Sequence, residues 1–444
     1  MSTTIEKMES LFSPKYGIGN FSIDSTRRVR NVKAENCKVT LGNIIPTYNF
    51  ILGHKDLSTW AGGAVSLNKE KCKIKTFGEF MERYSSSYVK NENNIELLHD
   101  SYDNLTTKGI SCYDLSNFVS FLDFQYDQPK FTFSRYSTAN PILWAEGREL
   151  TGNKKLWLPA QKMFLSHPGL AKEPRYIQGM STGCACGETF KQAALSGLYE
   201  VIERDSFMLT WLLQLPGVRI DMDSFKNKDL QVLYRHINKY LVGEDELHIY
   251  DISRTEGVYT VCTFIRNDLP HAFGLIVSAA SHKDPEMAVL KSLEELCQCQ
   301  SFAFYNLFKD EDEKRKIIDK EDVKELDDHV FYYSTSRRNG NIDFIASTEK
   351  SICISKLINY SKDSIETDLE DLLDDFKQRR EPVFALDLTK PEIRDAGFHV
   401  LKIAVPDYLD INIPNNANEL GSKRLQNLKQ KHNTKINDEP HPFP

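Results

Sequence analysis

The chain has 444 residues, 40% of them hydrophobic and 27% charged, and its 63 acidic residues outnumber its 56 basic ones, giving a formal net charge of −7. This composition is typical of a folded globular protein and excludes disorder as the main state. An acidic chain without a long Lys/Arg block is also poorly suited to bind the phosphate backbone of nucleic acid, so we expect no nucleic-acid partner.

Neither a membrane span nor a secretion signal is expected. No stretch approaches the run of about 18 apolar residues that a spanning helix needs, and the start, MSTTIEKMESLF, lacks the basic and apolar regions of a signal peptide. The nine cysteines are an odd number spread through a large chain, which fits reduced thiols better than a disulfide framework. We therefore expect a cytoplasmic protein with no membrane partner.

The first half of the chain predicts an N-terminal segment followed by alternating helices and strands. Residues 1–60 form that segment, and apolar residues at helical spacing then predict a helix over residues 69–89 with one buried stripe. Residues 131–165 predict strands and turns, and residues 169–187 predict a glycine-rich loop. A long helix is predicted over residues 189–211. The stripe of the first helix consists of Phe77, Met81, Tyr84 and Tyr88.

The second half continues the alternation. β-Branched and alternating runs predict adjacent strands over residues 247–277. Asp284 as an N-cap and Pro285 at the first helical position then predict the start of another helix. An amphipathic surface helix is predicted over residues 365–378. Two later strands are predicted at residues 383–386 and 400–405. The whole pattern predicts an α/β fold with a mixed β-sheet and flanking helices.

A repeated pentad, Glu-x-x-Glu-Arg, occurs on two of the predicted helices. Spacing of three or four residues places the charged side chains of each copy on one helix face. Two like charges there destabilise a helix unless a cation lies between them, and a metal ion would remove that cost. The two copies also indicate an internal structural repeat. Their members are Glu79, Glu82 and Arg83 in the first copy and Glu200, Glu203 and Arg204 in the second.

The second copy is the more informative one. Glu-x-x-Glu-Arg is common on solvated helices, so surface decoration is the plainer interpretation of a single copy. Residues 193–202, however, are apolar nearly all round, which is typical of a buried helix. Buried carboxylates need a metal ion or a paired cation, so a polar stripe on such a helix indicates an active site. The stripe consists of Ser196, Glu200, Glu203 and Arg204.

A third helix carries a related face with Lys291, Ser292, Glu295 and Gln298. Lys291 and Glu295 alone would be an ordinary i, i+4 surface pair. Considered together with the two pentads, they are better explained as the third side of one site. Carboxylates from three helices form the oxygen-rich shell that Mg²⁺ prefers, usually completed by water and nucleotide phosphates. Arginines bind phosphate bidentately. The residues therefore predict Mg²⁺ with a polyphosphate, without a Walker phosphate loop, since no such motif occurs.

Two other features leave alternatives open. The Cys184/Cys186 and Cys297/Cys299 pairs could form a four-thiolate zinc site, although C-x-C is tighter than the usual zinc knuckle, and small buried thiols are the plainer interpretation. The C-terminus ends in Glu-Pro-His-Pro-Phe-Pro. Most C-termini fray, but three alternating prolines preset an extended conformation, so this tail is expected to insert somewhere and present its terminal carboxylate. The prolines are Pro440, Pro442 and Pro444.

These motifs resemble those of the YcaO-domain family from about residue 60 to the C-terminus. The resemblance rests on Ser196-x-x-x-Glu200-x-x-Glu203-Arg204, Gly78-Glu79-x-x-Glu82-Arg83-Tyr84, Gly183-Cys-Ala-Cys-Gly187, Glu295-x-x-Gln298, Asp387-Leu-Thr389, Val405-Pro406 and the P-x-P-x-P ending. The family implies a YcaO-type fold with pseudo-symmetric halves. Two positions depart from its pattern: Gly62-Gly63-Ala64-Val65-Ser66 replaces a glycine-lysine-glycine stretch, and Phe302 stands where an arginine is usual.

The resemblance implies an ATP-dependent cyclodehydratase of the azoline-forming branch, as in the biosynthesis of thiazole/oxazole-modified microcins and other bacteriocins. In that chemistry a Cys, Ser or Thr side chain of a ribosomally made precursor peptide attacks the preceding carbonyl. The resulting oxyanion takes the γ-phosphoryl group of ATP, and phosphate leaves as the thiazoline or oxazoline ring forms. The implied domains are an N-terminal segment (residues 1–60), the ATP-binding catalytic domain (61–414) and the C-terminal tail (415–444).

The resemblance also implies roles for individual residues. Ser196 and Gln298 would orient nucleotide or metal-bound water, Lys15 would contact nucleotide, and the carboxylate of Pro444, delivered by Pro442 and Pro440, would approach the substrate amide. Arg83 and Arg204 would face the phosphates, and Glu200 and Glu203 would belong to the nucleotide site through the Mg²⁺ that they hold. The residues implied to hold Mg²⁺ are Glu79, Glu82, Glu200, Glu203 and Glu295.

Partners follow from the same resemblance. We expect a separate leader-binding protein related to ubiquitin-activating enzymes, a flavin-dependent dehydrogenase acting later, and a homodimer or hetero-oligomer. Two alternatives stay open: a YcaO enzyme that forms thioamides or amidines, against which the proline ending speaks, and a non-catalytic nucleotide-binding scaffold of a peptide-modification complex, against which the full set of glutamates speaks. Carboxylate-bridged redox chemistry is set aside because no E-x-x-H pairs accompany these helices.

Overall fold

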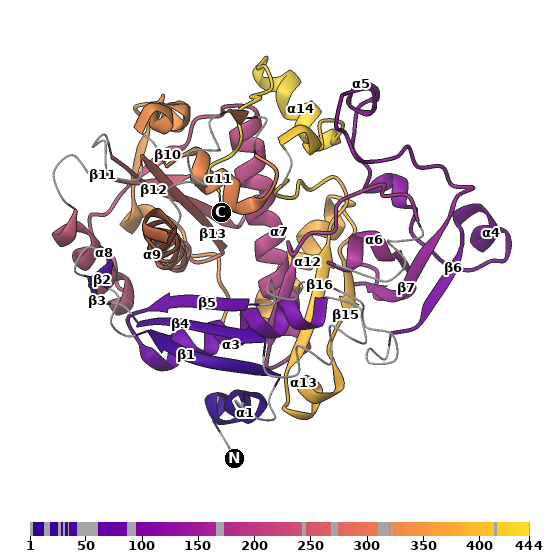
Figure 1. Ribbon diagram of the computed structural model, residues 1–444, viewed down its shortest axis with the longest axis horizontal. Coiled ribbons are helices and arrows are strands. Elements are labelled where there is room, and N and C mark those ends of the chain that lie inside the picture. The colour runs from indigo at the N-terminus through magenta and orange to yellow at the C-terminus, as the bar shows by residue number, and fades with distance from the viewer. Residues whose placement is uncertain are drawn as a thin grey trace.

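The computed structural model describes residues 3–12, 18–24, 28–29, 32–33, 35–41, 61–86, 95–165, 173–241, 246–267, 274–309, 319–320, 323–334, 336–412 and 415–443. Across these residues the fold is α/β, as predicted, with three main sheets around three long helices (Figure 1). No described helix is long and apolar enough to cross a membrane.

The three main sheets are built mostly from antiparallel pairs. A three-stranded sheet has the order β1 (Gly19–Asp24), β4 (Glu35–Leu41), β5 (Ala61–Ser66). A five-stranded sheet has the order β13 (Leu275–His282), β12 (Tyr259–Arg266), β11 (Glu246–Asp251), β10 (Val218–Asp221), β14 (Ser351–Cys353), the last joining in parallel. The third sheet has the order β6 (Leu97–Ser101), β7 (Pro141–Glu149), β15 (Phe384–Asp387), β16 (His399–Ala404), β9 (Cys184–Gly187), and β8 (Lys154–Pro159) pairs with β7. A small ribbon joins β2 (Arg28–Val29) to β3 (Val32–Lys33).

Three long helices alternate with these sheets around the centre of the molecule. Helix α3 (Lys69–Ser86) contacts β5 and β9, α7 (Phe190–Leu212) contacts β9 and β13, and α9 (Pro285–Lys309) contacts β13 and β5. The contacts therefore close into a ring in which each helix lies between two sheets. Figure 1 shows α7 standing between the five-stranded sheet and the sheet that contains β16. The strands β5, β9 and β13 are each the edge strand of their sheet.

The remaining helices lie around this ring. They are α1 (Thr4–Leu11), α4 (Tyr102–Thr107), α5 (Asp123–Tyr126), α6 (Ala160–Met163), α8 (Lys228–Tyr240), α11 (Leu326–Tyr332), α12 (Ile365–Gln378), α13 (Pro391–Asp395) and α14 (Lys423–His432).

Several helix boundaries agree with the sequence signals. Helix α7 follows Thr189, whose side chain accepts a hydrogen bond from the Gln192 amide at 3.1 Å. Helix α9 begins at Pro285 directly after Asp284, whose carboxylate accepts from the Glu286 amide at 2.8 Å. Helix α12 spans the predicted residues. The loop predicted over residues 169–187 is wrong at its end, because the last four residues form strand β9.

Strand β9 escapes local pattern reading because its partner is distant in sequence. It pairs antiparallel with β16, with Gly187 opposite His399 and Cys184 opposite Lys402. The segment just before it packs closely on its neighbours: Gly183 has φ +81°, and a Cβ atom there would lie 2.2 Å from the Ile403 carbonyl oxygen. This close approach fixes the turn that enters β9.

Candidate functional site

The two pentads and the third helix meet in one place. The charges of Glu82 on α3 and Glu200 on α7 act on one another, as do those of Glu203 on α7 and Glu295 on α9. The site therefore gathers carboxylates from all three helices of the ring, as the sequence predicted.

On α3, each glutamate of the pentad is held by a backbone amide of an edge strand. The Gly63 amide of β5 donates to Glu79 Oε2 at 2.7 Å, and the Cys186 amide of β9 donates to Glu82 Oε1 at 2.8 Å. Edge strands present amides that no neighbouring strand can pair, and the glutamates satisfy them. The glycine segment that replaces the family's glycine-lysine-glycine stretch thus positions Glu79 through its backbone.

On α7, the second pentad repeats this arrangement. The Gly183 amide, directly before β9, donates to Glu200 Oε2 at 3.0 Å, and the Ser281 amide of β13 donates to Glu203 Oε2 at 3.1 Å. In both copies the first glutamate therefore binds a glycine of the preceding strand segment, and the second binds the next strand around the ring. The internal repeat inferred from the sequence has a matching pattern of contacts.

Gln298 closes the ring on α9. Its Nε2 donates to the Gly63 carbonyl oxygen at 3.0 Å, so that Gly63 contacts α3 through its amide and α9 through its carbonyl. Glu295-x-x-Gln298 thus has the spacing of the two glutamates in the pentads, with an amide in place of the second carboxylate. Ser292 shares the spacing of the predicted face on the third helix, but its side chain is fully buried and hydrogen-bonded to Thr263.

Both arginines of the pentads pair with their own glutamates. Arg83 Nη2 lies 2.6 Å from Glu79 Oε1, and the Arg83 side chain is 42% exposed. Arg204 is more enclosed, with Nη2 3.6 Å from Glu200 Oε1 and Nε 3.4 Å from Glu203 Oε1. Since each guanidinium has five N–H donors, both can also bind a phosphate oxygen.

Burial and mutual repulsion raise the pKa values of these carboxyl groups, so that without a bound cation they hold protons more tightly than exposed glutamates do. Burial, followed by the charge of Glu200, raises the pKa of Glu82 to about 8. Burial raises the pKa of Glu295 to about 7 and that of Glu203 well above its ordinary value, and like-charged glutamates add to both shifts. Buried groups with such pKa values are typical of functional sites.

The residues fit a bound divalent cation. Glu203 Oε1 is buried and accepts no hydrogen bond, and each glutamate of the pentads uses one oxygen for an edge amide. The second oxygens of Glu79 and Glu200 face Arg83 and Arg204, so a bound cation would share them with the arginines. Carboxylate oxygens are the donors that Mg²⁺ prefers. As the side chains stand, no three Asp, Glu, His or Cys residues within the described ranges are grouped closely enough to hold one ion.

Other predicted site residues have different surroundings. Ser196 is exposed near the start of α7, one turn before Glu200. Lys15 and Pro444 lie outside the described residues. The cysteines of the two C-x-C pairs form no disulfide within the described residues, and burial raises the pKa of Cys184 to about 12, which supports the interpretation as small buried thiols.

Sequence reasoning missed Lys402. It is a buried lysine of β16 whose Nζ donates to the Met180 carbonyl at 2.6 Å and to the Thr182 carbonyl, and its charge opposes the rise in the pKa of Glu200. It therefore holds the chain directly before Gly183. The sequence does contain a signal for this residue, a single lysine within the apolar run VLKIAV. A lysine in a buried strand indicates a specific partner, since lysine is rarely buried without one.

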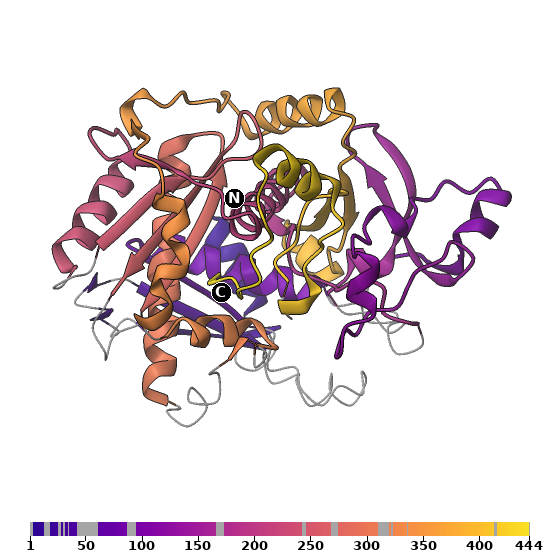
Figure 2. The same ribbon diagram turned by 90° about the horizontal axis from the view of Figure 1, so that it is seen from above.

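The C-terminal tail reaches the site. Pro440, His441, Pro442 and Phe443 are buried, and the Phe443 ring centroid lies 4.3 Å from the Arg204 guanidinium carbon. The penultimate residue thus contacts the second pentad, and seen from above, the chain runs from α14 to an end near the middle of the molecule (Figure 2).

Comparison with known proteins identifies the family. The family model described as YcaO cyclodehydratase, ATP- and Mg²⁺-binding, matches residues 65–409. The chain therefore belongs to the YcaO family, and the predictions of family, fold class, ATP and Mg²⁺ are confirmed.

Two curated relatives are similar to parts of the chain. An uncharacterized protein of Methanothermobacter thermautotrophicus is 27% identical over 269 residues, which are 59% of this chain and 64% of that protein. An uncharacterized protein in the tfuA 3' region of Rhizobium leguminosarum bv. trifolii is 28% identical over 172 residues, 36% of this chain and 39% of that protein. The chain thus matches less than two thirds of either relative.

Solved structures share the fold. A heterocyclase in complex with substrate and cofactor has a TM-score of 0.78 at 20% identity, covering 99% of this chain and 57% of that one. YcaO from Methanopyrus kandleri bound with AMPPCP and Mg²⁺ has a TM-score of 0.61 at 18% identity, covering 92% and 91%. The E. coli microcin synthetase McbBCD complex contains a chain with a TM-score of 0.63 at 14% identity, covering 96% of both.

Proposed function

We propose that the chain is an ATP-dependent cyclodehydratase that forms thiazoline or oxazoline rings from Cys, Ser or Thr of a ribosomally made precursor peptide. The observation that carries the proposal is the convergence of two Glu-x-x-Glu-Arg pentads, Glu295 and the proline-ended tail on one site. ATP would supply the phosphoryl group that makes the amide oxygen a leaving group, and Mg²⁺ would neutralise the phosphates.

The protein residues then act mainly by positioning and charge. The five glutamates Glu79, Glu82, Glu200, Glu203 and Glu295 would hold Mg²⁺, each aimed by the edge amide or helix that fixes it. Arg83 and Arg204 would bind phosphate oxygens. Ser196 and Gln298 would orient nucleotide or metal-bound water, and Lys15 would add a nucleotide contact.

The tail would serve the peptide half of the reaction. Phe443 packs on Arg204, and the next residue carries the terminal carboxylate. A carboxylate next to the reacting amide can accept the proton that the amide nitrogen loses as the ring forms. We infer this role for Pro444, with Pro440 and Pro442 fixing the direction of the tail.

The balanced reaction defines its products. The side-chain oxygen or sulfur bonds to the preceding carbonyl carbon, the amide oxygen leaves with the phosphoryl group, and the nitrogen loses its proton as C=N forms. Peptide and ATP are converted to azoline, ADP, phosphate and a proton. We also propose a separate leader-binding partner related to ubiquitin-activating enzymes and a later flavin-dependent dehydrogenase, since the chain covers 57% of a heterocyclase chain and shares its fold with one chain of a multi-protein synthetase.

The test is mass spectrometry of a precursor peptide incubated with the full chain, its partner, ATP and Mg²⁺. The proposal predicts the loss of one water mass per ring together with one ADP and one phosphate. A gain from oxygen-to-sulfur exchange would indicate thioamide formation instead. No peptide change with retained nucleotide binding would favour the scaffold alternative.

A tail variant separates the two halves of the site. Adding one glycine after Pro444 moves the terminal carboxylate while leaving all 444 residues in place. We expect nucleotide binding to persist and ring formation to fall about 100-fold or more, the size typical of losing a positioned acid or base. Unchanged ring formation would exclude the terminal carboxylate from the chemistry.

A further inference from the structure

The proline-rich end of the chain is held mainly through its backbone carbonyls. Three successive carbonyl oxygens each accept a hydrogen bond from an aromatic side chain. The side chain is the donor in each pair because a carbonyl oxygen can only accept. The pairs are Glu439 O with Trp211 Nε1 at 3.0 Å, Pro440 O with Tyr333 Oη at 2.6 Å, and His441 O with His329 Nδ1 at 2.8 Å. Proline has no N–H, so a proline-rich segment is most readily recognised by donors to its carbonyls.

Asn437, two residues before the first of these carbonyls, fixes where the tail begins. Asn437 caps the C-terminal end of α7, with its amide 2.7 Å from the Leu212 carbonyl and its Nδ2 3.2 Å from the Trp211 carbonyl. Helix ends leave such carbonyls without an internal partner. Tyr332 Oη then donates to the Glu439 carboxylate at 2.7 Å. The tail therefore starts from a fixed point on the helix.

From there the tail follows one face of α7 toward the pentad. Trp211, Phe207 and Arg204 are spaced four and three residues apart on that face. Trp211 contacts Glu439, Phe207 packs on the Phe443 ring at a centroid distance of 4.8 Å, and Arg204 lies over the same ring. Aromatic rings therefore line the groove that the tail occupies, defined here by its contacts with Trp211, Phe207 and Tyr333, as in proteins that bind proline-rich peptides.

The histidine between the prolines is also fitted to the groove. His441 is 3% exposed, stacks on His329 at 3.9 Å, and its Nε2 lies 3.1 Å from the Asn412 carbonyl. Both rings are therefore held by carbonyl partners and by each other.

We propose that these residues form a built-in receptor for a proline-rich C-terminal peptide, able to bind the same peptide supplied as a separate molecule. The receptor consists of Trp211, Phe207, His329, Tyr332, Tyr333 and Asn412. The proposal does not depend on which reaction the enzyme catalyses, because it concerns how the tail is recognised. It implies that the tail is a ligand of the fold that can be exchanged or displaced.

The test uses the full chain with its own tail weakened. The attached tail has a high effective concentration and would outcompete a free peptide. A Pro440→Ala/Pro442→Ala variant keeps the carbonyls but loses the preset backbone conformation, which weakens the attached tail. A fluorescein-labelled peptide with the sequence of residues 437–444, NDEPHPFP, is then titrated with this variant while fluorescence anisotropy is measured.

We expect saturable binding that adding Tyr333→Phe weakens by about two- to tenfold, the range for one lost hydrogen bond. The matched control, Tyr360→Phe, removes a hydroxyl outside the groove and should leave the affinity unchanged. Absence of saturable binding, or equal binding of a peptide in which alanine replaces all three prolines, overturns the proposal.

A second measurement covers the case in which the double variant fails to fold. Hydrogen–deuterium exchange of the C-terminal peptide is compared between the unaltered chain and Tyr333→Phe. The His441 and Phe443 amides should exchange about two- to tenfold faster in Tyr333→Phe. Equal exchange in both proteins means that the carbonyl contact does not hold the tail, which contradicts the proposal.

Discussion

At the residue scale, Gly183 has two functions in this site. Its amide binds Glu200, and its lack of a side chain allows the chain to pass the Ile403 carbonyl and α7. The neighbouring helix is fitted to this turn as well, because a Cβ atom on Gly197 would lie 2.7 Å from the Gly183 oxygen. The two glycines therefore let the backbone before β9 pack directly against α7, where its amide reaches Glu200.

Gly183→Ala should therefore destabilise the protein by about 3 kcal/mol or more, since it adds a backbone clash to the cost of a left-handed conformation. Gly109→Ala is the matched control, because Gly109 has φ +73° and no atom within 4 Å of its Cβ position. It should cost about 1 to 2 kcal/mol. Urea unfolding measures both, and equal losses would mean that close packing at Gly183 contributes nothing.

Glu82 gives a pH prediction for the protein without nucleotide or metal. The folded state keeps the Glu82 proton up to about pH 8, whereas the unfolded chain releases it near its ordinary pKa of 4.5. The folded state therefore binds more protons in this interval, and its stability falls as the pH rises.

Between pH 6 and pH 8 in EDTA, we expect a loss of about 2 kcal/mol that Glu82→Gln reduces, because the amide does not titrate. Chemical unfolding at the two pH values measures it. A Glu82→Gln protein with the full pH dependence of the unaltered chain would show that another group is responsible.

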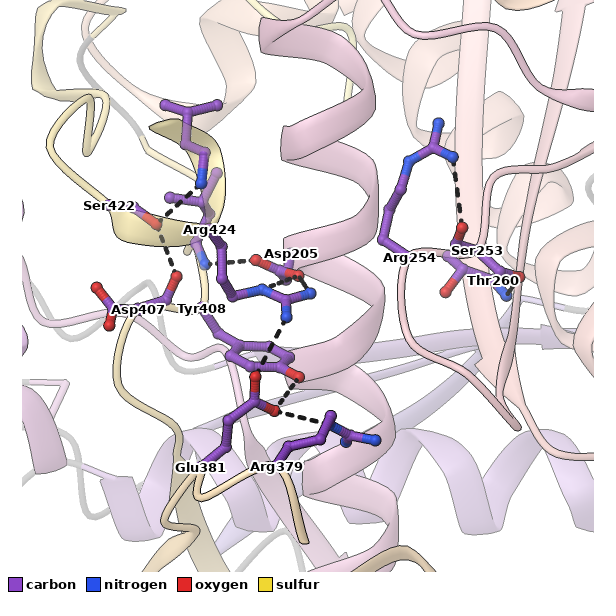
Figure 3. A network of polar contacts seen from close by, with 12 residues as sticks. Asp205, Ser253, Arg254, Thr260, Arg379, Glu381, Asp407, Tyr408, Ser422 and Arg424 are labelled. Atoms are coloured by element: carbon purple, nitrogen blue, oxygen red, sulfur yellow. Dashed lines mark hydrogen bonds and ion pairs between the residues drawn. The ribbon is translucent and has the colours of Figure 1, made fainter. Parts of the chain in front are cut away.

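At the element scale, α7 connects the glutamates of the second pentad with the C-terminal elements. Asp205 follows the second pentad directly, is fully buried, and accepts from Arg424 of α14 through Nε at 3.1 Å and Nη2 at 2.7 Å (Figure 3). The Leu409 amide donates to the other Asp205 oxygen at 3.1 Å. Helix α14 and the tail that follows it are thus attached to α7 beside Arg204.

Asp205→Asn should destabilise the protein by about 3 kcal/mol, because it leaves the largely buried Arg424 without its main charge partner. Asp407→Asn is the matched control, because it removes a carboxylate from the same group of contacts whose partner, Lys423 at 3.6 Å, is exposed. The control should cost at most about 1 kcal/mol. Thermal unfolding compares them, and equal losses would contradict a structural role for the buried pair.

The sequence predicted the three long helices well, because their stripes, caps and pentads are local signals. Helix α12 and the Pro285 start of α9 agree with the structure for the same reason. The sequence could not predict that β9 is a strand or that edge amides hold the glutamates, since both depend on partners far along the chain. The Cys186 amide, for example, contacts Glu82 across 104 positions.

At the scale of the whole molecule, three sheets and three helices form a ring with the carboxylates at its centre. The sequence predicted that three helices line one site, but it could not predict the strands between them, such as β5, whose Gly63 contacts both α3 and Gln298 of α9. The C-terminal tail also contacts this site, because the Phe443 ring packs against Arg204. The domain boundaries at residues 60 and 414 stay predictions.

The proposed function assigns leader binding to a separate partner protein. Alone with ATP, Mg²⁺ and peptide, the protein should turn over slowly, and adding the leader-binding partner should raise the rate at least about tenfold through correct positioning of the peptide. Phosphate release measures both rates. An equal rate without the partner would show that this chain binds its substrate unaided.

The most direct test of the central claim is calorimetric titration of the full chain with Mg²⁺ and ATP, compared with Glu203→Gln. Glu203 lies within the polar stripe of α7, and its buried Oε1 accepts no hydrogen bond, so its loss should abolish measurable nucleotide binding. Glu246→Gln, at a side chain 76% exposed on β11, is the control and should bind normally. If Glu203→Gln bound ATP as tightly as the unaltered chain, the pentads would not form the nucleotide site.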